Sequence, residues 1–196
     1  MRAFVAVEIT EPAVLDGIRE LQAALTPPDP KAVRLVDADT LHFTLQFLGE
    51  IPDGAQRPVA DALSAVRFAP FDLEVGGVGA FPNIGSPRIV WVGGGGGGGR
   101  EATAGGNAGL PLSGLARKVS GALAPLGYAR DKPFRPHSTI LRVKRAPADI
   151  AGRLEERAGR GTFGVQRVDK FKLKKSRLTP EGPVYTDLAV VEGAGR

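Results

Sequence analysis

The sequence has no cysteine and only two histidines among its 196 residues. Without cysteine, a disulfide framework, thiolate chemistry and cysteine-based zinc sites are excluded. No apolar run approaches the roughly 20 residues that a membrane-spanning helix needs. The first residues, MRAFVAVEITEP, also lack the apolar core of a signal peptide. We therefore expect a cytoplasmic protein without a membrane partner.

Charge is divided unevenly along the chain. Residues 1–99 carry 7 Lys and Arg against 12 Asp and Glu, a net charge of −5, whereas residues 100–196 carry 19 against 9, a net charge of +10. A basic half can supply a positive surface for a polyanion such as RNA. The alternative is that this charge is scattered and serves only to keep the protein in solution.

The two histidines lie in the same four-residue pattern: histidine, any residue, threonine, aliphatic residue. The first copy spans 42–45 and the second spans 137–140, 95 positions later. Both copies lie in runs rich in β-branched, aliphatic and aromatic residues, which favour strands. Because side chains alternate along a strand, the histidine and the threonine of each copy share one face.

Strict alternation also assigns the neighbours of the first histidine. It predicts an apolar core face formed by Leu41, Phe43, Leu45 and Phe47. It predicts a polar face formed by His42, Thr44 and Gln46. If the second strand meets the first across a cleft, that cleft contains two imidazoles and two hydroxyls.

This set of side chains suits cleavage of a phosphodiester without a metal. One imidazole can act as general base and the other as general acid near neutral pH, and hydroxyls can donate hydrogen bonds to phosphate oxygens. The ordinary alternative is a structural role for each histidine. A zinc site is less well supported, because two histidines leave a tetrahedral site short of ligands and neither His-x-Thr contains Asp or Glu.

Five segments together resemble the RNA 2′,3′-cyclic phosphodiesterases, also called 2′-5′ RNA ligases, of the two-histidine phosphoesterase superfamily. They are MRAFVAVEI (1–9), LHFTLQFLGE (41–50), GAFPNIGSPRIVWVG (79–93), GYARDKPFRPHSTILRVKR (127–145) and LKKSRLTPEGPVY (173–185). One departure is Ser138, where the family usually has an aliphatic residue that faces the core. The resemblance implies one α+β domain over residues 1–196. In it, two pseudo-symmetric lobes, each an antiparallel sheet with helices, enclose a central cleft.

The resemblance also implies an activity, namely hydrolysis of RNA 2′,3′-cyclic phosphate ends to 2′-phosphomonoesters. It implies His42 as acid, His137 as base, Thr44 and Thr139 as phosphate ligands, and neither metal nor cofactor. The expected partner is RNA, with tRNA fragments among the candidates, and the expected state is a monomer. The reverse reaction would join RNA ends through a 2′-5′ linkage. The open alternatives are a phosphodiesterase for small cyclic nucleotides or ADP-ribose cyclic phosphate, and a non-catalytic RNA-binding module.

Further residues are candidates for contact with RNA. The basic candidates near the second motif are Arg130, Lys132, Arg135, Arg142 and Lys144. We favour Arg135 because it stands two residues before His137 and so is predicted on the same strand face. Phe47 and Tyr185 can stack on a terminal base, although a core position is the ordinary alternative. Ser176 is a candidate without an assigned role.

The remaining patterns predict the elements around these motifs. Helices are predicted near 11–25, 54–66, 112–124 and 147–158. Strands are predicted near 2–9, 33–36, 41–48, 71–75, 88–92, 162–173 and 183–191, with glycines ending the strand at 71–75, and the second histidine strand is predicted to begin near Phe134. Residues 93–111 are Gly-rich and predict a flexible loop. A phosphate-binding loop is disfavoured because no Gly-Lys-Ser/Thr follows.

Overall fold

A computed structural model describes residues 1–95, 111–130, 132–158, 161–180 and 182–194. The helices are α1 (Pro12–Leu25), α2 (Gln56–Ser64), α3 (Pro111–Leu123) and α4 (Ile150–Glu155). The strands are β1 (Arg2–Glu8), β2 (Val33–Leu35), β3 (His42–Glu50), β4 (Phe71–Phe81), β5 (Ile89–Gly94), β6 (His137–Val143), β7 (Thr162–Val168), β8 (Lys170–Leu178) and β9 (Pro183–Glu192). The loop predicted at 93–111 is corrected at both ends, because Gly93 and Gly94 belong to β5 and Pro111 belongs to α3. Its residues 96–110 lie outside the described part of the chain.

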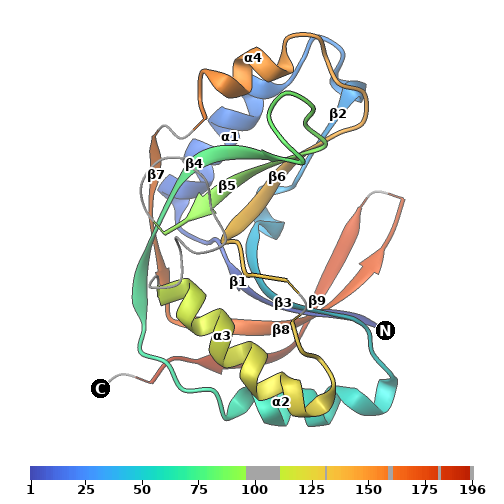
Figure 1. The fold of residues 1–196 in the computed structure, drawn as a ribbon, viewed down its shortest axis with the longest axis vertical. Helices are drawn as coiled ribbons and strands as arrows, with labels where there is room; N and C mark the ends of the chain where they lie inside the picture. Colours follow the sequence, from blue (N-terminus) through green and yellow to red (C-terminus); the bar gives the residue numbers. More distant parts are fainter. Residues whose placement is uncertain (96–110, 131, 159–160, 181, 195–196) are drawn as a thin grey trace.

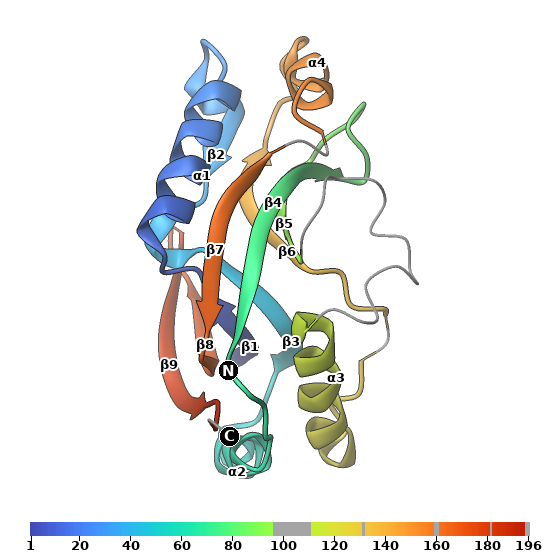
Figure 2. The same cartoon turned by 90° about the vertical axis from the view of Figure 1, so that its left-hand side faces the viewer.

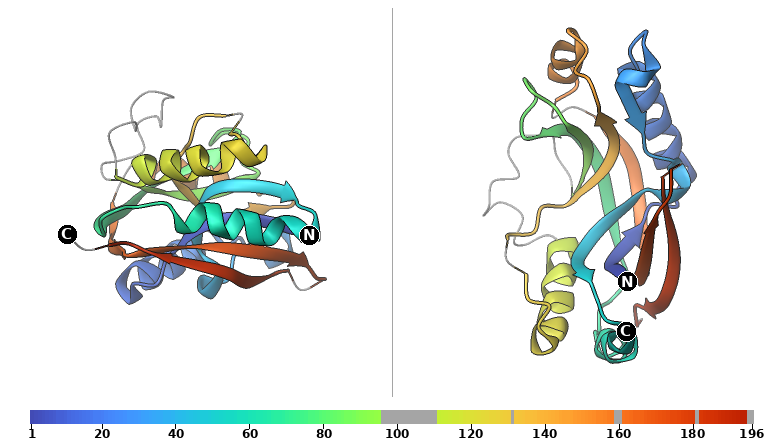
Figure 3. Two further views of the ribbon diagram at one scale, coloured as in Figure 1. Left: turned by 90° about the horizontal axis from the view of Figure 1, so that it is seen from below. Right: turned by 90° about the vertical axis from the view of Figure 1, so that its right-hand side faces the viewer.

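The strands form two antiparallel sheets, and each sheet belongs to one lobe (Figure 1). Sheet A has the order β3-β1-β8-β9, and sheet B has the order β2-β6-β5-β4-β7. Helices α2 and α3 pack beside one another on the lobe of sheet A, and α1 and α4 pack on the lobe of sheet B (Figures 2 and 3). The predicted two-lobed α+β fold is therefore confirmed, and each sheet contains one histidine strand.

The lobes do not correspond to the two halves of the sequence. Sheet A combines β1 and β3 from the first half with β8 and β9 from the end of the chain. The prediction of one strand over 162–173 is wrong, because the chain leaves sheet B at Val168 and enters sheet A at Lys170. Apolar residues alternate at Phe163 and Val165 and again at Phe171 and Leu173, but Arg167 and Val168 interrupt the pattern between them. The prediction passed over this interruption, which precedes the change of sheet at Asp169.

The glycines of β4 do not end the strand. It continues through them to Phe81, and the only tryptophan of the chain covers one of them. A Cβ atom on Gly79 would lie 2.2 Å from the indole of Trp91, its partner in β5. Gly79 therefore gives the indole room to lie flat on the sheet, where a larger residue would collide with it. None of the described helices is both long and apolar enough to cross a membrane.

Candidate active site

The first histidine strand, β3, is an edge strand of sheet A and pairs with β1. Ala6 is the register partner of Thr44 and Val5 is the partner of Gln46, which leaves Leu45 without a partner in β1. Leu45 is thus the extra residue of a β-bulge, a feature that redirects the side chains after it. The bulge begins directly after His-x-Thr.

The second histidine strand, β6, has the same irregularity at the same place in its motif. Trp91 is the partner of Thr139 and Val90 is the partner of Leu141, which leaves Ile140 without a partner in β5. The unpaired residue again stands three positions after the histidine. The two motifs therefore share a backbone geometry as well as a sequence pattern.

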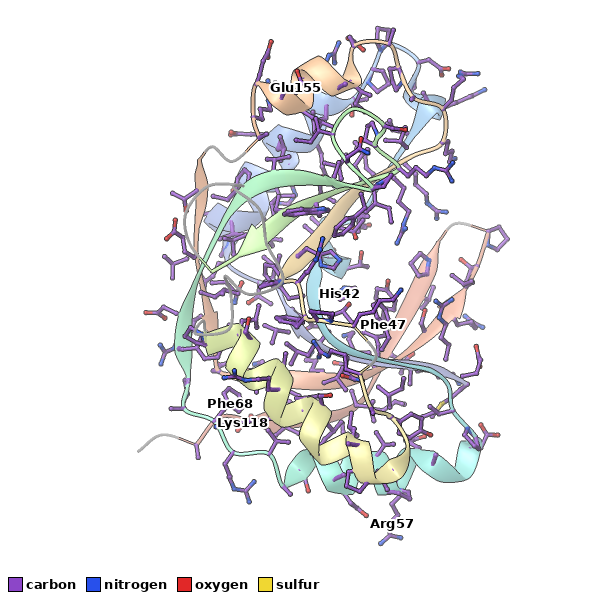
Figure 4. All side chains as sticks on the ribbon, in the orientation of Figure 1. His42, Phe47, Arg57, Phe68, Lys118 and Glu155 are labelled. Carbon is purple, nitrogen blue, oxygen red and sulfur yellow. The ribbon has the colours of Figure 1, made fainter. Side chains whose placement is uncertain are left out.

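The bulge overturns the faces predicted for two residues of β3. Gln46 is only 5 % exposed, whereas Phe47 is 66 % exposed. The ring of Phe47 lies 6.3 Å from that of Phe4, which in turn lies 5.0 Å from the imidazole of His42. Figure 4 shows His42 and Phe47 in the region between the two lobes. Strict alternation predicted the opposite faces, because an extra residue reverses the alternation of every side chain that follows.

A backbone carbonyl two residues upstream orients each imidazole. Nδ1 of His42 lies 2.7 Å from the carbonyl oxygen of Thr40, and Nδ1 of His137 lies 2.7 Å from that of Arg135. A carbonyl only accepts hydrogen bonds, so Nδ1 carries the hydrogen and donates it. In both residues Nε2 therefore remains for chemistry, as an acceptor when the ring is neutral and a donor when it is protonated.

The imidazole of His42 lies among aromatic rings on the inner face of sheet A, the face that carries His42 and Thr44. The ring of Tyr185 stands edge-on to it, with centroids 5.4 Å apart and an interplanar angle of 88°. Burial lowers the pKa of His42 from its usual value. The charge of Lys174 lowers this pKa further, and the carboxylate of Glu8 acts in the opposite direction.

The imidazole of His137 has an equivalent aromatic environment in sheet B. The ring of Phe81 stands edge-on at 5.1 Å, and the indole of Trp91 lies 6.2 Å away. Burial lowers the pKa of His137, and the charge of Arg135 lowers it further. The charge of His137 also lowers the pKa of His42, so the two imidazoles lie within electrostatic reach of one another.

The motif threonines lie one strand repeat after the histidines. Thr44 and Thr139 are half-buried, and neither hydroxyl makes a hydrogen bond within the described part of the chain. Both hydroxyls can therefore donate to an oxygen of a ligand. Among the same residues, no group of three or more His, Asp or Glu side chains is placed to hold a metal ion.

Four charged side chains form a network beside His42. Nζ of Lys172 lies 2.7 Å from Oε2 of Glu8 and 2.7 Å from Oδ2 of Asp187. Lys174, which is 6 % exposed, contacts the other oxygens of both carboxylates. Burial alone would raise the pKa of each carboxylate, but the lysine bonds outweigh it and hold both values below the usual range. Glu8 is the register partner of His42, so the network adjoins the imidazole.

Sequence reasoning missed this network, although a signal for it was present. Lysines alternate with buried apolar residues along Lys170–Lys174, which places charge on the inner face of a strand. The acidic partners lie on β1 and β9, and only the strand order of sheet A shows that both adjoin β8.

Several predicted RNA contacts lie near one or the other histidine. Tyr185 is the register partner of Ser176. Burial raises the pKa of Tyr185, whereas the charge of Arg142 acts in the opposite direction and so lies within reach of the phenol. Arg142 occupies the position five residues after its histidine, as Phe47 does in the first strand, and both are exposed. Arg135 is exposed and within electrostatic reach of His137.

Two other predicted RNA contacts lie elsewhere. Lys144 follows the end of β6, where its backbone N–H donates to the carbonyl of Ala32 at 2.8 Å. Arg130 is half-buried, and its guanidinium donates to the carbonyl of Leu45 and to Oε1 of Gln46. Its charge is therefore directed at β3.

Comparison with known proteins gives concordant matches. The family model described as LigT like phosphoesterase matches residues 7–91 and 107–185. The RNA 2′,3′-cyclic phosphodiesterase of Archaeoglobus fulgidus is 38 % identical over 192 residues, which cover 98 % of this chain and 100 % of that protein. The enzyme of the same name from Thermus thermophilus is 35 % identical over 192 residues, which cover 96 % of this chain and 88 % of that protein.

Solved structures agree with these matches. The crystal structure of the protein TT0787 of Thermus thermophilus has a TM-score of 0.75 and 33 % identity, covering 100 % of this chain and 99 % of that one. The structure of E. coli LigT complexed with 3′-AMP has a TM-score of 0.71 and 28 % identity, covering 98 % of this chain and 97 % of that one.

Proposed function

The chain belongs to the family of LigT-like phosphoesterases, and we propose that it hydrolyses RNA 2′,3′-cyclic phosphate ends to 2′-phosphomonoesters. The relatives from Archaeoglobus fulgidus and Thermus thermophilus are named for activity on this substrate, and E. coli LigT was crystallised with 3′-AMP. The observation that carries the proposal is the equivalent orientation of two imidazoles. Nδ1 of each is bonded to a backbone carbonyl, and each has a threonine hydroxyl two residues further along its strand.

In the proposed reaction, water attacks the cyclic phosphate and the bond from phosphorus to O3′ breaks. Neutral Nε2 of one histidine takes a proton from the water as the new bond to phosphorus forms. Protonated Nε2 of the other gives its proton to O3′, so the product carries a 2′-phosphate and a 3′-hydroxyl. Neither step requires a metal. The next turnover begins after the two histidines have exchanged their protons with solvent.

We assign His42 as the acid and His137 as the base, as the resemblance to the family implies. The carboxylate of Glu8 favours the protonated form of His42 that an acid needs, but the charge of Lys174 opposes it and is the stronger of the two. The charge of Arg135 favours the neutral form of His137 that a base needs.

The motif threonines would bind the non-bridging phosphate oxygens. Negative charge builds up on these oxygens as water attacks, and hydroxyls already aimed at them stabilise the transition state. Thr44 and Thr139 come from different sheets, so the phosphate would be held from both lobes.

The RNA would extend from the phosphate along the inner face of sheet A. Phe47 and Tyr185 would stack on the terminal base, and the exposed ring of Phe47 supports this role. Arg142 and Arg135 are candidates for contact with backbone phosphates, because each acts electrostatically on a site residue. Ser176, beside Tyr185, and Lys144, at the end of β6, are further candidates.

The biological setting is part of the proposal. We infer a monomeric cytoplasmic enzyme whose substrates include tRNA fragments with cyclic ends. Reverse ligation through a 2′-5′ linkage would use the same two proton transfers in the opposite direction.

The test is turnover of an oligoribonucleotide with a 2′,3′-cyclic phosphate end, in EDTA, with the phosphate position of the product determined. We expect a 2′-phosphomonoester. Cyclic mononucleotides and ADP-ribose cyclic phosphate serve as competing substrates. A product formed from these alone would favour a small-molecule phosphodiesterase, and RNA binding without turnover would favour a binding module.

A further inference from the structure

The carbonyl of each bulge residue is bonded by groups outside its own ladder. The carbonyl oxygen of Leu45, in β3, accepts from the guanidinium of Arg130. The carbonyl oxygen of Ile140, in β6, accepts from the backbone N–H of Val36 at 2.9 Å and from Nε2 of Gln22 at 2.8 Å. Two of these donors lie in segments that lead into the other histidine strand: Arg130 precedes β6, and Val36 precedes β3. The third, Gln22, lies on α1, which packs on sheet B.

The first of these attachments fixes the segment before His137 to β3. Arg130 also donates to Oε1 of Gln46, from Nε at 3.3 Å and from Nη2 at 3.2 Å. Nε2 of Gln46 donates to the carbonyl of Tyr128 at 3.0 Å. The guanidinium lies 5.0 Å from the ring centroid of Phe134, so it also stacks within its own segment. Tyr128, Arg130 and Phe134 are therefore held against the strand that carries the other histidine.

The second attachment fixes the segment before His42 to β6. Nε2 of Gln22, a buried side chain of α1, donates both to the carbonyl of Val36 at 2.7 Å and to that of Ile140 at 2.8 Å. The backbone N–H of Val36 bonds to the same carbonyl of Ile140. The side-chain amide of Gln22 therefore bridges the segment before His42 and β6 in a buried setting, where a hydrogen bond left unmade costs free energy.

We propose that these two attachments form a reciprocal clasp, in which Arg130 and Gln22 are positioning residues that set the relative placement of the two imidazoles. The carbonyls that orient the imidazoles, those of Thr40 and Arg135, lie within the clasped segments. Each histidine is thus oriented by a segment that is fixed to the strand of the other. The clasp is distinct from the substrate contacts, although its catalytic consequence rests on the proposed function.

A positioning role predicts an effect on kcat and little effect on KM. Acid–base catalysis needs both Nε2 atoms in line with the phosphate, and a misplacement of about 1 Å can lower the rate by about a hundredfold. We expect Arg130→Met and Gln22→Met to lower kcat at least tenfold, with KM changed by less than about twofold. The fold loss of kcat in the double variant is expected to be smaller than the product of the two single losses, because both substitutions change the relative placement of the same two imidazoles.

The kinetic comparison uses Arg153→Met as its matched control. Arg153 is also partly buried and also donates to two backbone carbonyls, those of Ala24 and Thr26, but it lies on α4 and, among the described residues, makes no hydrogen bond or ion pair with either histidine strand. Its replacement should leave kcat unchanged below the melting temperature. If Arg130 contacts RNA instead, Arg130→Met would raise KM and flatten its dependence on salt, with kcat retained. That result, or an equal loss of kcat in the Arg153 variant, would overturn the proposal.

A second readout does not depend on turnover. Only two histidines exist, so a histidine-selective NMR spectrum contains one signal set for each imidazole. The clasp predicts that Arg130→Met and Gln22→Met each shift both sets, and that Arg153→Met shifts neither. Unshifted imidazole signals in folded Arg130→Met and Gln22→Met would refute the clasp. If the wild-type protein turned over no cyclic phosphate, the proposed function would fail while the spectra still decided on the clasp.

Discussion

Ser138→Ala is expected to make the protein more stable. Ser138 lies between the histidine and threonine of the second motif, is 1 % exposed, and its hydroxyl has no hydrogen-bond partner within the described residues. A buried polar group left without a partner costs about 1 to 3 kcal/mol. The equivalent residue of the first motif is Phe43, which is fully buried and apolar.

The magnitude follows from the removal of one hydroxyl without added volume. We expect the free energy of unfolding to rise by about 1 to 2 kcal/mol, because alanine fills the same site without the unpaired group. For a chain of this length, 1 kcal/mol corresponds to roughly 2 to 4 °C in melting temperature. Ser138→Val should add to this gain if the two extra carbons fit, at about 0.8 kcal/mol for each buried CH₂.

Urea denaturation followed by circular dichroism measures this change. Ser64→Ala is the control, because the Ser64 hydroxyl is exposed and already donates to the carbonyl of Asp61 at 2.7 Å. The control should lose stability slightly or remain unchanged. A loss of stability in Ser138→Ala would show that the hydroxyl makes a hydrogen bond in the folded protein, and the reasoning would be refuted.

Three further predictions concern the site. Burial lowers the pKa of both His42 and His137 below the usual 6.5. The bell-shaped pH profile of kcat/KM should therefore peak below pH 6.5, because it rises as the base loses its proton and falls as the acid loses its own. A peak above pH 7 would contradict the burial argument. Phe47→Ala should raise KM for RNA, since stacking on a base contributes about 1 to 3 kcal/mol, whereas Phe47→Tyr should retain the wild-type KM; equal values in all three proteins would remove Phe47 from the binding site. Lys174→Met should lower the free energy of unfolding at pH 7 by about 1.5 to 3 kcal/mol, because two partly buried carboxylates lose one of their two lysine partners while Lys172 remains. The pKa values of both carboxylates are depressed in the folded protein, so the stability that they contribute is present above the pKa values of the unfolded chain and is lost as pH falls through those of the folded protein. In urea titrations, the difference in unfolding free energy between wild type and variant should therefore shrink below about pH 4. A difference that stays constant with pH would argue against the network.

The histidine motifs could be predicted from sequence because the chemistry depends on a short local pattern. Two copies of His-x-Thr in strand-forming runs place His42 with Thr44, and His137 with Thr139, on one face through alternation alone. The helices were predicted for a similar reason, since their apolar spacing is local. The contacts of each imidazole with its upstream carbonyl are also local but depend on the turn before the strand, which the motif does not encode.

The features that were not predicted depend on residues distant in sequence. The exposed position of Phe47 and the buried one of Gln46 follow from the bulge at Leu45, which is visible only in the pairing with β1. The break at Asp169 depends on which sheet receives each segment, and the interruption of the apolar alternation at Arg167 and Val168 does not specify this. The glycine at position 79 of β4 has a similarly distant cause: the indole of Trp91 fills the space over Gly79 from a neighbouring strand.

The most direct test of the two-histidine mechanism is single-turnover hydrolysis of a cyclic-phosphate oligoribonucleotide by the wild type, His42→Ala and His137→Ala, with binding measured in parallel. The account predicts a 2′-phosphate product from the wild type. It predicts that each variant binds the oligonucleotide but reacts about 10² to 10⁴ times more slowly. Wild-type rates in either variant would contradict the assignment of that histidine as an acid or base.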